Sequence, residues 1–109
     1  AYRKIKRGNL LSVAKRTVTA NTSLTYEDDL ILVDATSGNI TITLPDASLL
    51  TGYDGKRFDV KKIDSSANTV TIQDAAGNDI DFAATFVISS QGDSVSLIKD
   101  QPNSQYWMI

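Results

Sequence analysis

The sequence predicts an all-β fold: a single antiparallel β-sandwich or jelly-roll-like domain of about eight to ten short strands. Three observations indicate this class. Short segments rich in Val, Ile and Thr alternate apolar and polar residues. Turn-forming residues separate them at intervals of roughly 8–12 residues. No long helical pattern follows residue 16, and 109 residues suffice for one domain with a single core.

The first expected strands flank a tight turn. Residues 17–20 (TVTA) are the first candidate strand. Residues 30–35 (LILVDA) are nearly continuous in apolar side chains, which is typical of a central strand covered on both faces. Residues 39–44 (NITITL) alternate cleanly, and the TSGN sequence between these two strands favours a tight turn. The sequence therefore predicts a hairpin over residues 30–44.

The second half of the chain begins with a break in the pattern. Pro45 ends a strand, and Leu49 and Leu50 are expected to pack a loop or one helical turn over the sheet. A second hairpin is predicted over residues 56–73, around the polar turn DSSAN. The remaining expected strands cover residues 80–82, 85–89, 94–99 and 105–109. No internal repeat is apparent.

The first strand of the second hairpin carries a basic cluster on an irregular pattern. Phe58 and Val60 share one face, but Ile63 falls on the other. A strictly regular strand would turn Lys62 inward or Ile63 outward. A bulge near Lys61 and Lys62 is the economical alternative, because it returns Ile63 to the core and leaves both ammonium groups in water. On this interpretation the cluster is the solvated side of a hairpin.

The charges divide the chain into residues 1–16, a basic N-terminal arm, and residues 17–109, the β-sandwich body. The arm holds six of the eleven basic residues and no acidic residue, whereas the body holds five basic and thirteen acidic residues, a net charge of −8. Such an arm suits attachment to an anionic surface, or is a solubilising terminus. It could be a short helix, extended or disordered. The candidate attachment residues are Arg3, Lys4, Lys6, Arg7, Leu10, Leu11, Lys15 and Arg16.

Composition argues against several classes of function. The chain has no Cys and no His, which removes thiolate metal sites, disulfides and the commonest general base. Residues 74–81 (DAAGNDID) resemble a calcium loop but lack its ligand count. The acidic body argues against specific nucleic-acid binding, and no apolar run is long enough for membrane insertion. The sequence therefore predicts no enzyme, no metal site and no cofactor.

Two aromatic residues near the C-terminus are the other candidates. Tyr106 and Met108 should share one face of the last strand, and Trp107 and Ile109 the other. One pair would complete the core, and the other would meet solvent or a neighbouring subunit. Tyr106 and Trp107 are therefore possible ligand or subunit contacts, since aromatic faces also stack on sugar rings.

The order of several segments resembles a recurrent β-domain of tailed-bacteriophage structural proteins. The segments are ILVDATSGNITITLP, GKRFDVKKIDSSANTVTI, SQGDSVSLIKD and QYWMI. Together they span roughly residues 17–109, and residues 1–16 fall outside the resemblance. The shared features are structural: the turn glycines Gly38, Gly55 and Gly92, Pro45, and alternating core positions.

The resemblance implies a non-enzymatic virion protein found in tail fibres, receptor-binding proteins or head decorations, commonly as a homotrimer. We therefore expect a small oligomeric β-domain on the capsid surface or tail, attached to other virion proteins through its N-terminal arm. The alternative is a tip domain of a tail fibre that binds a host receptor or host-surface glycan, through Tyr106, Trp107 or the loop 46–54.

Overall fold

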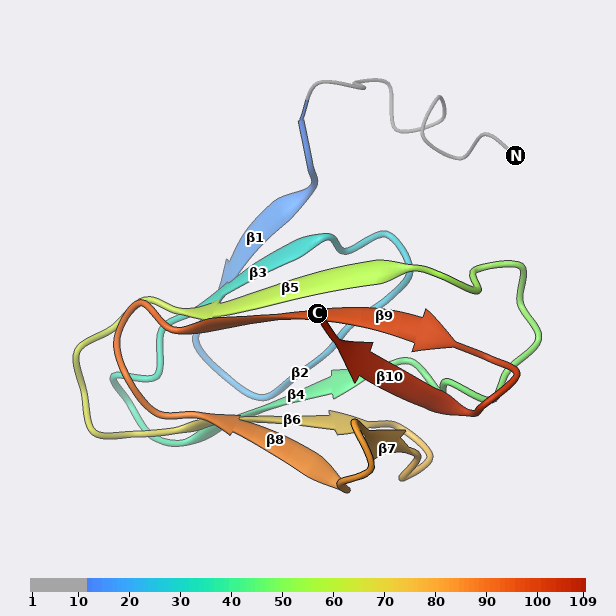
Figure 1. Cartoon of the computed structure of the whole chain (residues 1–109). Coiled ribbons are helices and arrows are strands. Elements are labelled where there is room, and N and C mark those ends of the chain that lie inside the picture. The colour runs from blue at the N-terminus through green and yellow to red at the C-terminus, as the bar shows by residue number, and fades with distance from the viewer. Residues whose placement is uncertain (1–11) are drawn as a thin grey trace.

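The computed structural model describes residues 12–109, which form ten β-strands and no helix (Figure 1). The all-β expectation is confirmed for these residues. The strands are β1 (Lys15–Val18), β2 (Thr22–Ser23), β3 (Leu30–Val33), β4 (Ile40–Leu44), β5 (Arg57–Lys62), β6 (Val70–Asp74), β7 (Asp79–Ile80), β8 (Thr85–Ile88), β9 (Ser94–Asp100) and β10 (Gln105–Met108).

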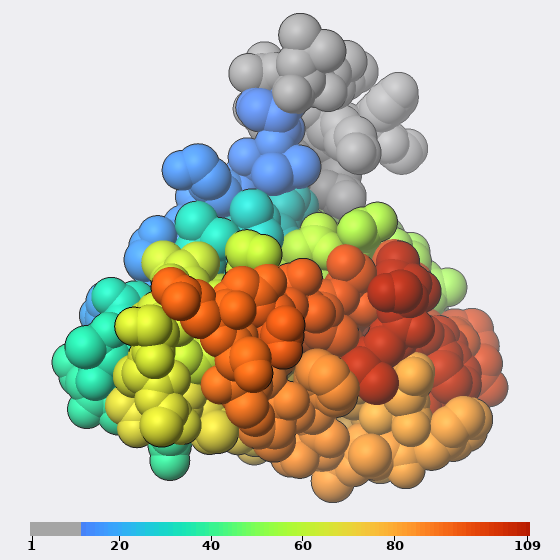
Figure 2. All heavy atoms as spheres, turned by 60° about the vertical axis from the view of Figure 1, so that its left-hand side comes forward, coloured from blue at the N-terminus to red at the C-terminus, as the bar shows by residue number. Residues whose placement is uncertain are grey.

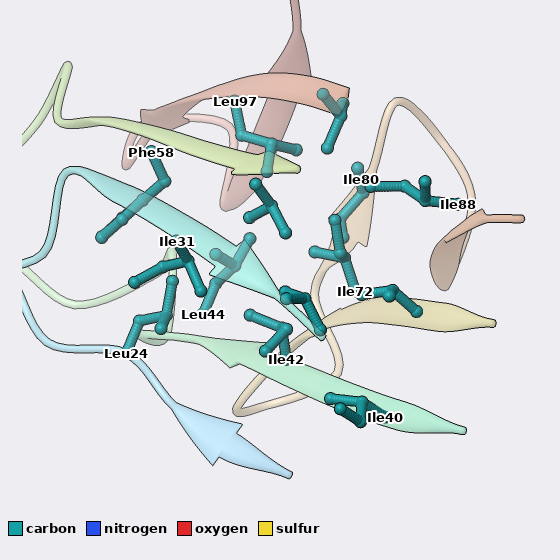
Figure 3. Close-up of a cluster of buried hydrophobic side chains, with 14 of the residues drawn as sticks. Leu24, Ile31, Ile40, Ile42, Leu44, Phe58, Ile72, Ile80, Ile88 and Leu97 are labelled. Carbon is teal, nitrogen blue, oxygen red and sulfur yellow. The ribbon is translucent and has the colours of Figure 1, made fainter. Parts of the chain in front are cut away.

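The strands form two sheets with a shared core between them. One sheet has six strands in the order β1-β3-β5-β9-β10-β7, and the other has four in the order β2-β4-β6-β8. Alternating residues of both sheets are fully or almost fully buried, and Figure 3 shows the side chains converging between the layers. The residues labelled there are Leu24, Ile31, Ile40, Ile42, Leu44, Phe58, Ile72, Ile80, Ile88 and Leu97. The alternation seen in the sequence therefore identifies the core faces.

The expectation of antiparallel pairing is wrong for most of the structure. From β1 to β6 the chain alternates between the two sheets, and neighbours within each sheet run parallel. Of the eight strand pairings within residues 15–108, five are parallel and three antiparallel. The first six strands thus follow a helical path, here called the coil, in which each turn contributes one strand to each sheet. β8, β9 and β10 then pair antiparallel with β6, β5 and β9. Alternation could not distinguish these cases because it specifies a face and not a partner.

Both predicted hairpins are wrong for the same reason. β3 and β4 lie in different sheets, as do β5 and β6. Residues 34–39 form a corner between sheets, and the backbone bonds at its two ends go to neighbouring turns of the coil. At one end the Asp34 amide donates to the Val18 carbonyl (2.9 Å), and at the other the Ile40 amide donates to the Thr69 carbonyl (2.9 Å). Corner residues rich in Gly, Asn and Asp look the same in sequence as hairpin turns.

The coil also reveals an internal repeat, contrary to the interpretation of the sequence. Leu30 lies beside Asp59, and Ile42 lies beside Ile72, so the turn β3–β4 and the turn β5–β6 are offset by 29 residues in one sheet and by 30 in the other. The aligned corners read VDATSGN-ITI and KIDSSANTVTI. The Asn39 side-chain oxygen accepts the Thr69 amide of the next turn (2.9 Å). The repeat is weak in sequence because it consists of turn residues and alternation alone.

The predicted bulge near Lys61 and Lys62 is also wrong. β5 pairs regularly with β3 and β9, and its burial alternates to the end of the strand. The Lys62 side chain is fully buried, whereas Ile63 is 36% exposed. Lys56 is buried as well, so the basic cluster is not simply a solvated face. The strand remains regular because acceptors in the following corner compensate the buried ammonium group of Lys62.

Those acceptors are held in the corner after β5. The Lys62 Nζ atom donates to Asp64 Oδ2 (2.9 Å), to the Asp64 carbonyl (3.0 Å) and to the Ser66 carbonyl (3.0 Å). The Asp64 carboxylate also accepts the Ser66 hydroxyl and the amide of Ala35, in the preceding turn of the coil, at 2.7 Å. The Ser66 hydroxyl, followed by Lys62 and the Ala35 and Ser66 amides, holds the pKa of Asp64 well below its usual range, against the effect of burial.

The lowered pKa of Asp64 predicts a loss of stability in acid. A carboxyl group whose pKa is lowered on folding stabilises the native state above its unfolded pKa of about 4, and this contribution declines as the pH falls below that value. Asp64→Asn should therefore destabilise the protein at pH 7, and the difference from wild type should shrink between pH 4 and pH 2. Urea unfolding across this range measures the effect.

Asp34→Asn is the matched control for this experiment, because Asp34 occupies the equivalent corner one turn earlier and its carboxylate bonds the nearby Thr36. Its cost at pH 7 should be smaller than that of Asp64→Asn, because the Asp34 hydrogen bonds are exposed and water can replace a lost partner. A pH-independent difference for Asp64→Asn would refute the assignment.

The loop between β4 and β5 does not use its leucines as expected. Leu49 is 49% exposed and Leu50 is 88% exposed, so neither covers the sheet. Polar groups hold the loop instead. The buried Lys99 Nζ donates to the Leu49 carbonyl (3.0 Å), and the Tyr106 hydroxyl donates to the Pro45 carbonyl (2.7 Å). The two leucines are therefore exposed on a loop that Lys99 and Tyr106 hold in place.

Candidate functional site

Tyr106 lies in the core, on the inner face of β10. Its side chain is buried, and its ring meets the Phe58 ring edge to face, with centroids 6.1 Å apart. Burial, and then the nearby phenol of Tyr26 and carboxylates of Asp74 and Asp46, raise the pKa of Tyr106 far above its usual value of 10. Its hydroxyl is therefore a neutral donor to the loop, and the residue is not available to a ligand.

Trp107 lies on the face of β10 opposite Tyr106, as the alternation predicts, and this face is the outer one, where a second aromatic residue joins it. The Phe82 ring meets the indole edge to face, with centroids 5.3 Å apart and an interplanar angle of 70°. Phe82 is 77% exposed, and Trp107 is half-buried. The indole Nε1 donates to Asp100 Oδ2 (2.7 Å), which fixes the orientation of the ring. The structure thus forms an exposed aromatic pair from residues 25 positions apart in the sequence.

The turn that displays Phe82 has an unusual backbone. Asp81 and Phe82 have φ angles of 47° and 67°, in the left-handed region that residues with a Cβ atom rarely occupy. Three hydrogen bonds hold the turn against β10: Asp81 N to the Tyr106 carbonyl (3.0 Å), Phe82 N to Gln105 Oε1 (2.9 Å), and Met108 N to Asp81 Oδ1 (2.9 Å). The sequence pattern predicted a strand at Phe82 and did not indicate its exposure, because nothing in the sequence DIDFAA signals this conformation.

The remainder of the outward-facing surface continues across the six-stranded sheet. Trp107 pairs with Ile98 on β9, and Ile98 pairs with Arg57 on β5. Phe82, Ile98 and Trp107 are hereafter called the aromatic patch. The Arg57 guanidinium, at its margin, contacts the Asp59 carboxylate (3.2 Å) and the Ser96 hydroxyl (3.1 Å). The patch is therefore apolar at its centre and bordered by charged and polar groups.

The last residue of β9 and the turn that follows it supply further polar groups beside Trp107. The Asn103 amide donates to Asp100 Oδ2 (2.7 Å), the same oxygen that accepts the Trp107 indole. Hydrogen bonds from Asn103 and then Trp107 hold the pKa of Asp100 below its usual range. The carboxylate therefore remains ionised at neutral pH and fixes both the turn and the indole.

Two of the eight candidate attachment residues, Lys15 and Arg16, belong to the part of the chain that the structure describes. Arg3, Lys4, Lys6, Arg7, Leu10 and Leu11 lie outside the described residues. Lys15 and Arg16 belong to β1, so the last two residues assigned to the arm are part of the six-stranded sheet. Both are exposed, and Arg16 binds the Asp28 carboxylate through two nitrogen atoms (2.9 and 3.2 Å).

Comparisons with known proteins find no protein-family model that matches the chain and no curated protein whose sequence matches it. Within residues 12–109, no three carboxylates gather closely enough to hold a metal ion. In the calcium-loop-like segment 74–81, the buried Asp74 has a structural role: its carboxylate accepts the amides of Ala47 (2.8 Å) and Ala76 (2.7 Å). In the same part of the chain, no helix is long and apolar enough to cross a membrane.

Proposed function

We propose that this chain is a non-enzymatic structural protein of a tailed-phage virion: a β-domain that forms a homotrimer and attaches to the capsid or tail through its N-terminal segment. The resemblance of residues 17–109 to phage structural domains motivates the proposal. The observation that carries it is the position of β1 at the edge of the six-stranded sheet. β1, which continues directly from the basic segment, is an edge strand at the open end of the coil.

The two ends of the coil differ in a way that suits one-sided attachment. At the open end, β1 and β2 each have a neighbour on one side only. At the other end, β7 and β8 are also the outermost strands of their sheets, but β7 contacts β6 and β8 and so connects the two sheets there. Figure 2 shows β1 in blue at the upper margin of the body, with the red C-terminal strand to the right. Attachment through the open end would leave the C-terminal strands accessible.

Charge favours the N-terminal segment over the body as the contact with an acidic surface. Three of the five positive side chains in residues 17–109, Lys56, Lys62 and Lys99, are buried. Arg57 and Lys61 are left at the surface, against eleven of the thirteen acidic residues, since Asp64 and Asp74 are buried. An acidic partner would therefore repel the body and attract the segment that carries Arg3, Lys4, Lys6 and Arg7.

Strand addition at the open end is a less suitable mode of attachment. β1 carries Lys15 and Arg16, and charged side chains on an edge strand oppose pairing with another strand. Contact through the charged side chains of Arg3, Lys4, Lys6 and Arg7 avoids this obstacle. The proposal therefore assigns attachment to charge and not to extension of the sheet.

Neutralising the N-terminal charges tests the proposal. The variant that replaces Arg3, Lys4, Lys6 and Arg7 by Gln keeps the length of the chain and leaves β1 intact. Its binding to phage particles assembled without this protein, measured by co-sedimentation, should fall at least about tenfold, since several charge contacts are lost together. A variant that exchanges Arg and Lys at the same four positions should bind as wild type does.

Equal binding by the neutralised variant would contradict attachment through these residues. The trimer is tested separately by light scattering, where it should give a mass three times the 11.8 kDa of the chain. A monomer at micromolar concentration would contradict that part of the proposal.

A further inference from the structure

We propose that the aromatic patch is a carbohydrate-binding site, on which the face of a pyranose ring stacks on one of the two aromatic rings, Phe82 or Trp107, and its edge meets the other, since the two rings are inclined by 70°. This inference goes beyond the proposed attachment role, because it concerns the opposite end of the coil and a different partner. It begins from an anomaly: Phe82 combines 77% exposure with a left-handed backbone. Exposing a large aromatic ring and holding it at positive φ both disfavour the folded state.

The turn itself does not need a phenylalanine. The three hydrogen bonds that hold it come from the backbone and from the Asp81 and Gln105 side chains. Glycine would adopt the same φ of 67° without strain, since it has no Cβ atom. The Phe82 ring, which packs edge to face against Trp107, is therefore an addition to the turn that the local fold does not require.

The second ring of the patch is fixed before any ligand arrives. Asp100 Oδ2 accepts both the Trp107 indole nitrogen and the Asn103 amide, each at 2.7 Å. Ile98 lies beside Trp107 on the neighbouring strand. Rings that are already oriented lose little conformational freedom on binding. A small ligand that makes few contacts can therefore bind to them.

The chemistry at the margin favours a sugar. A pyranose ring has an apolar face of C–H groups that can stack on an aromatic ring, and hydroxyl groups that require hydrogen bonds around its edge. Here the edge groups are the carboxylate of Asp100, the amide of Asn103 and the guanidinium of Arg57. The carboxylates of Asp81 and Asp100 disfavour a nucleic acid, whose phosphates they would repel. The patch therefore suits a neutral or amino sugar unit of a polysaccharide.

The test uses Trp107, the single tryptophan of the chain, as its reporter. The full chain is screened on an array of neutral and amino-sugar oligosaccharides. The probes that bind, with cellohexaose, maltohexaose and chitohexaose included in any case, are then titrated while tryptophan fluorescence is recorded. We expect at least one oligosaccharide to bind and to change the emission of Trp107.

Phe82→Gly separates function from folding, because its two expected effects have opposite signs. The variant should lose at least about tenfold in affinity for the oligosaccharide, since half of the stacking surface is removed. Its melting temperature should be unchanged or higher, since the strain at positive φ is relieved. Leu50→Ala is the matched control: Leu50 is 88% exposed, lies outside the patch, and its loss should leave affinity unchanged.

Failure to bind any oligosaccharide on the array would overturn the proposal, as would equal affinity of wild type and Phe82→Gly. Self-association that Phe82→Gly abolishes, without any oligosaccharide binding, would also overturn it and identify the patch as a subunit contact. All these measurements use the isolated chain. Their outcome is therefore independent of whether the N-terminal segment attaches the protein to a particle.

Discussion

Replacing Lys62 by methionine should lower the free energy of unfolding by about 3–5 kcal/mol, the cost typical of removing one partner of a buried ion pair. Methionine has a similar length and fits an apolar site, so the change tests the charge more than the volume. Without the ammonium group, the nearly buried Asp64 carboxylate loses its positive partner, and the Ser66 carbonyl loses a donor. Urea unfolding at pH 7 measures the difference.

Lys61→Met is the matched control for this substitution. Lys61 is adjacent on the same strand but half-buried on the other face, where its Nζ donates to the Gly92 carbonyl (2.7 Å). Its replacement should cost less than about 1 kcal/mol, as is usual at surface positions. A similar cost at both positions would contradict a specific role for the buried pair.

The double variant Lys62→Met/Asp64→Asn isolates the interaction between the two side chains. Its cost should be smaller than the sum of the two single costs, because removal of both charges leaves no unpaired ion in the corner. Strict additivity would show that the Lys62 and Asp64 side chains stabilise the corner independently.

Local sequence patterns predicted which face of each strand enters the core, but not which strands pair with one another. Alternation over 39–44 identified the side chains that enter the core from this segment, and the structure buries Ile40, Ile42 and Leu44. It could not show that β4 and β6 lie side by side and parallel, since a strand alternates in the same way beside any partner. The corner sequences DATSGN and DSSAN were informative about turning, yet equally compatible with hairpins and with a coil.

The behaviour of Lys62 shows a second limit of local patterns. A strictly regular strand would have buried this residue, and the general reluctance of lysine to be buried argued for a bulge instead. The deciding factor is the set of three acceptors that the corner of Asp64 and Ser66 provides. That set exists only once the corner has folded against Ala35, 29 residues from Asp64.

For the candidate site, alternation identified one of the three residues of the aromatic patch. It placed Trp107 on the face opposite Tyr106, and the burial of the two residues agrees. It could not place Phe82, because the exposure of that ring depends on two successive left-handed residues held by bonds to β10. Such a conformation is imposed by tertiary contacts, and no short-range sequence signal specifies it for Asp and Phe.

Tyr106→Ala should cost about 3–5 kcal/mol of stability, the range for truncating a large aromatic side chain in a packed core. The cavity would open beside Phe58, and the Pro45 carbonyl would lose its donor. Tyr106→Phe should cost only about 1 kcal/mol, since it removes the hydroxyl and keeps the ring. Trp107→Ala, on the outer face of the same strand, should cost less than Tyr106→Ala when all are measured by urea unfolding.

The Phe variant also tests the raised pKa of Tyr106. A phenol that stays neutral in the folded state, but ionises above about pH 10 when unfolded, stabilises the protein below that pH and loses this contribution as the pH rises further. The advantage of wild type over Tyr106→Phe should therefore shrink above pH 10. If the advantage persists there, or if Trp107→Ala proves the costlier truncation, then Tyr106 is not the inner residue of β10. In that case the outward-facing position of Trp107, on which the aromatic patch depends, would be refuted as well.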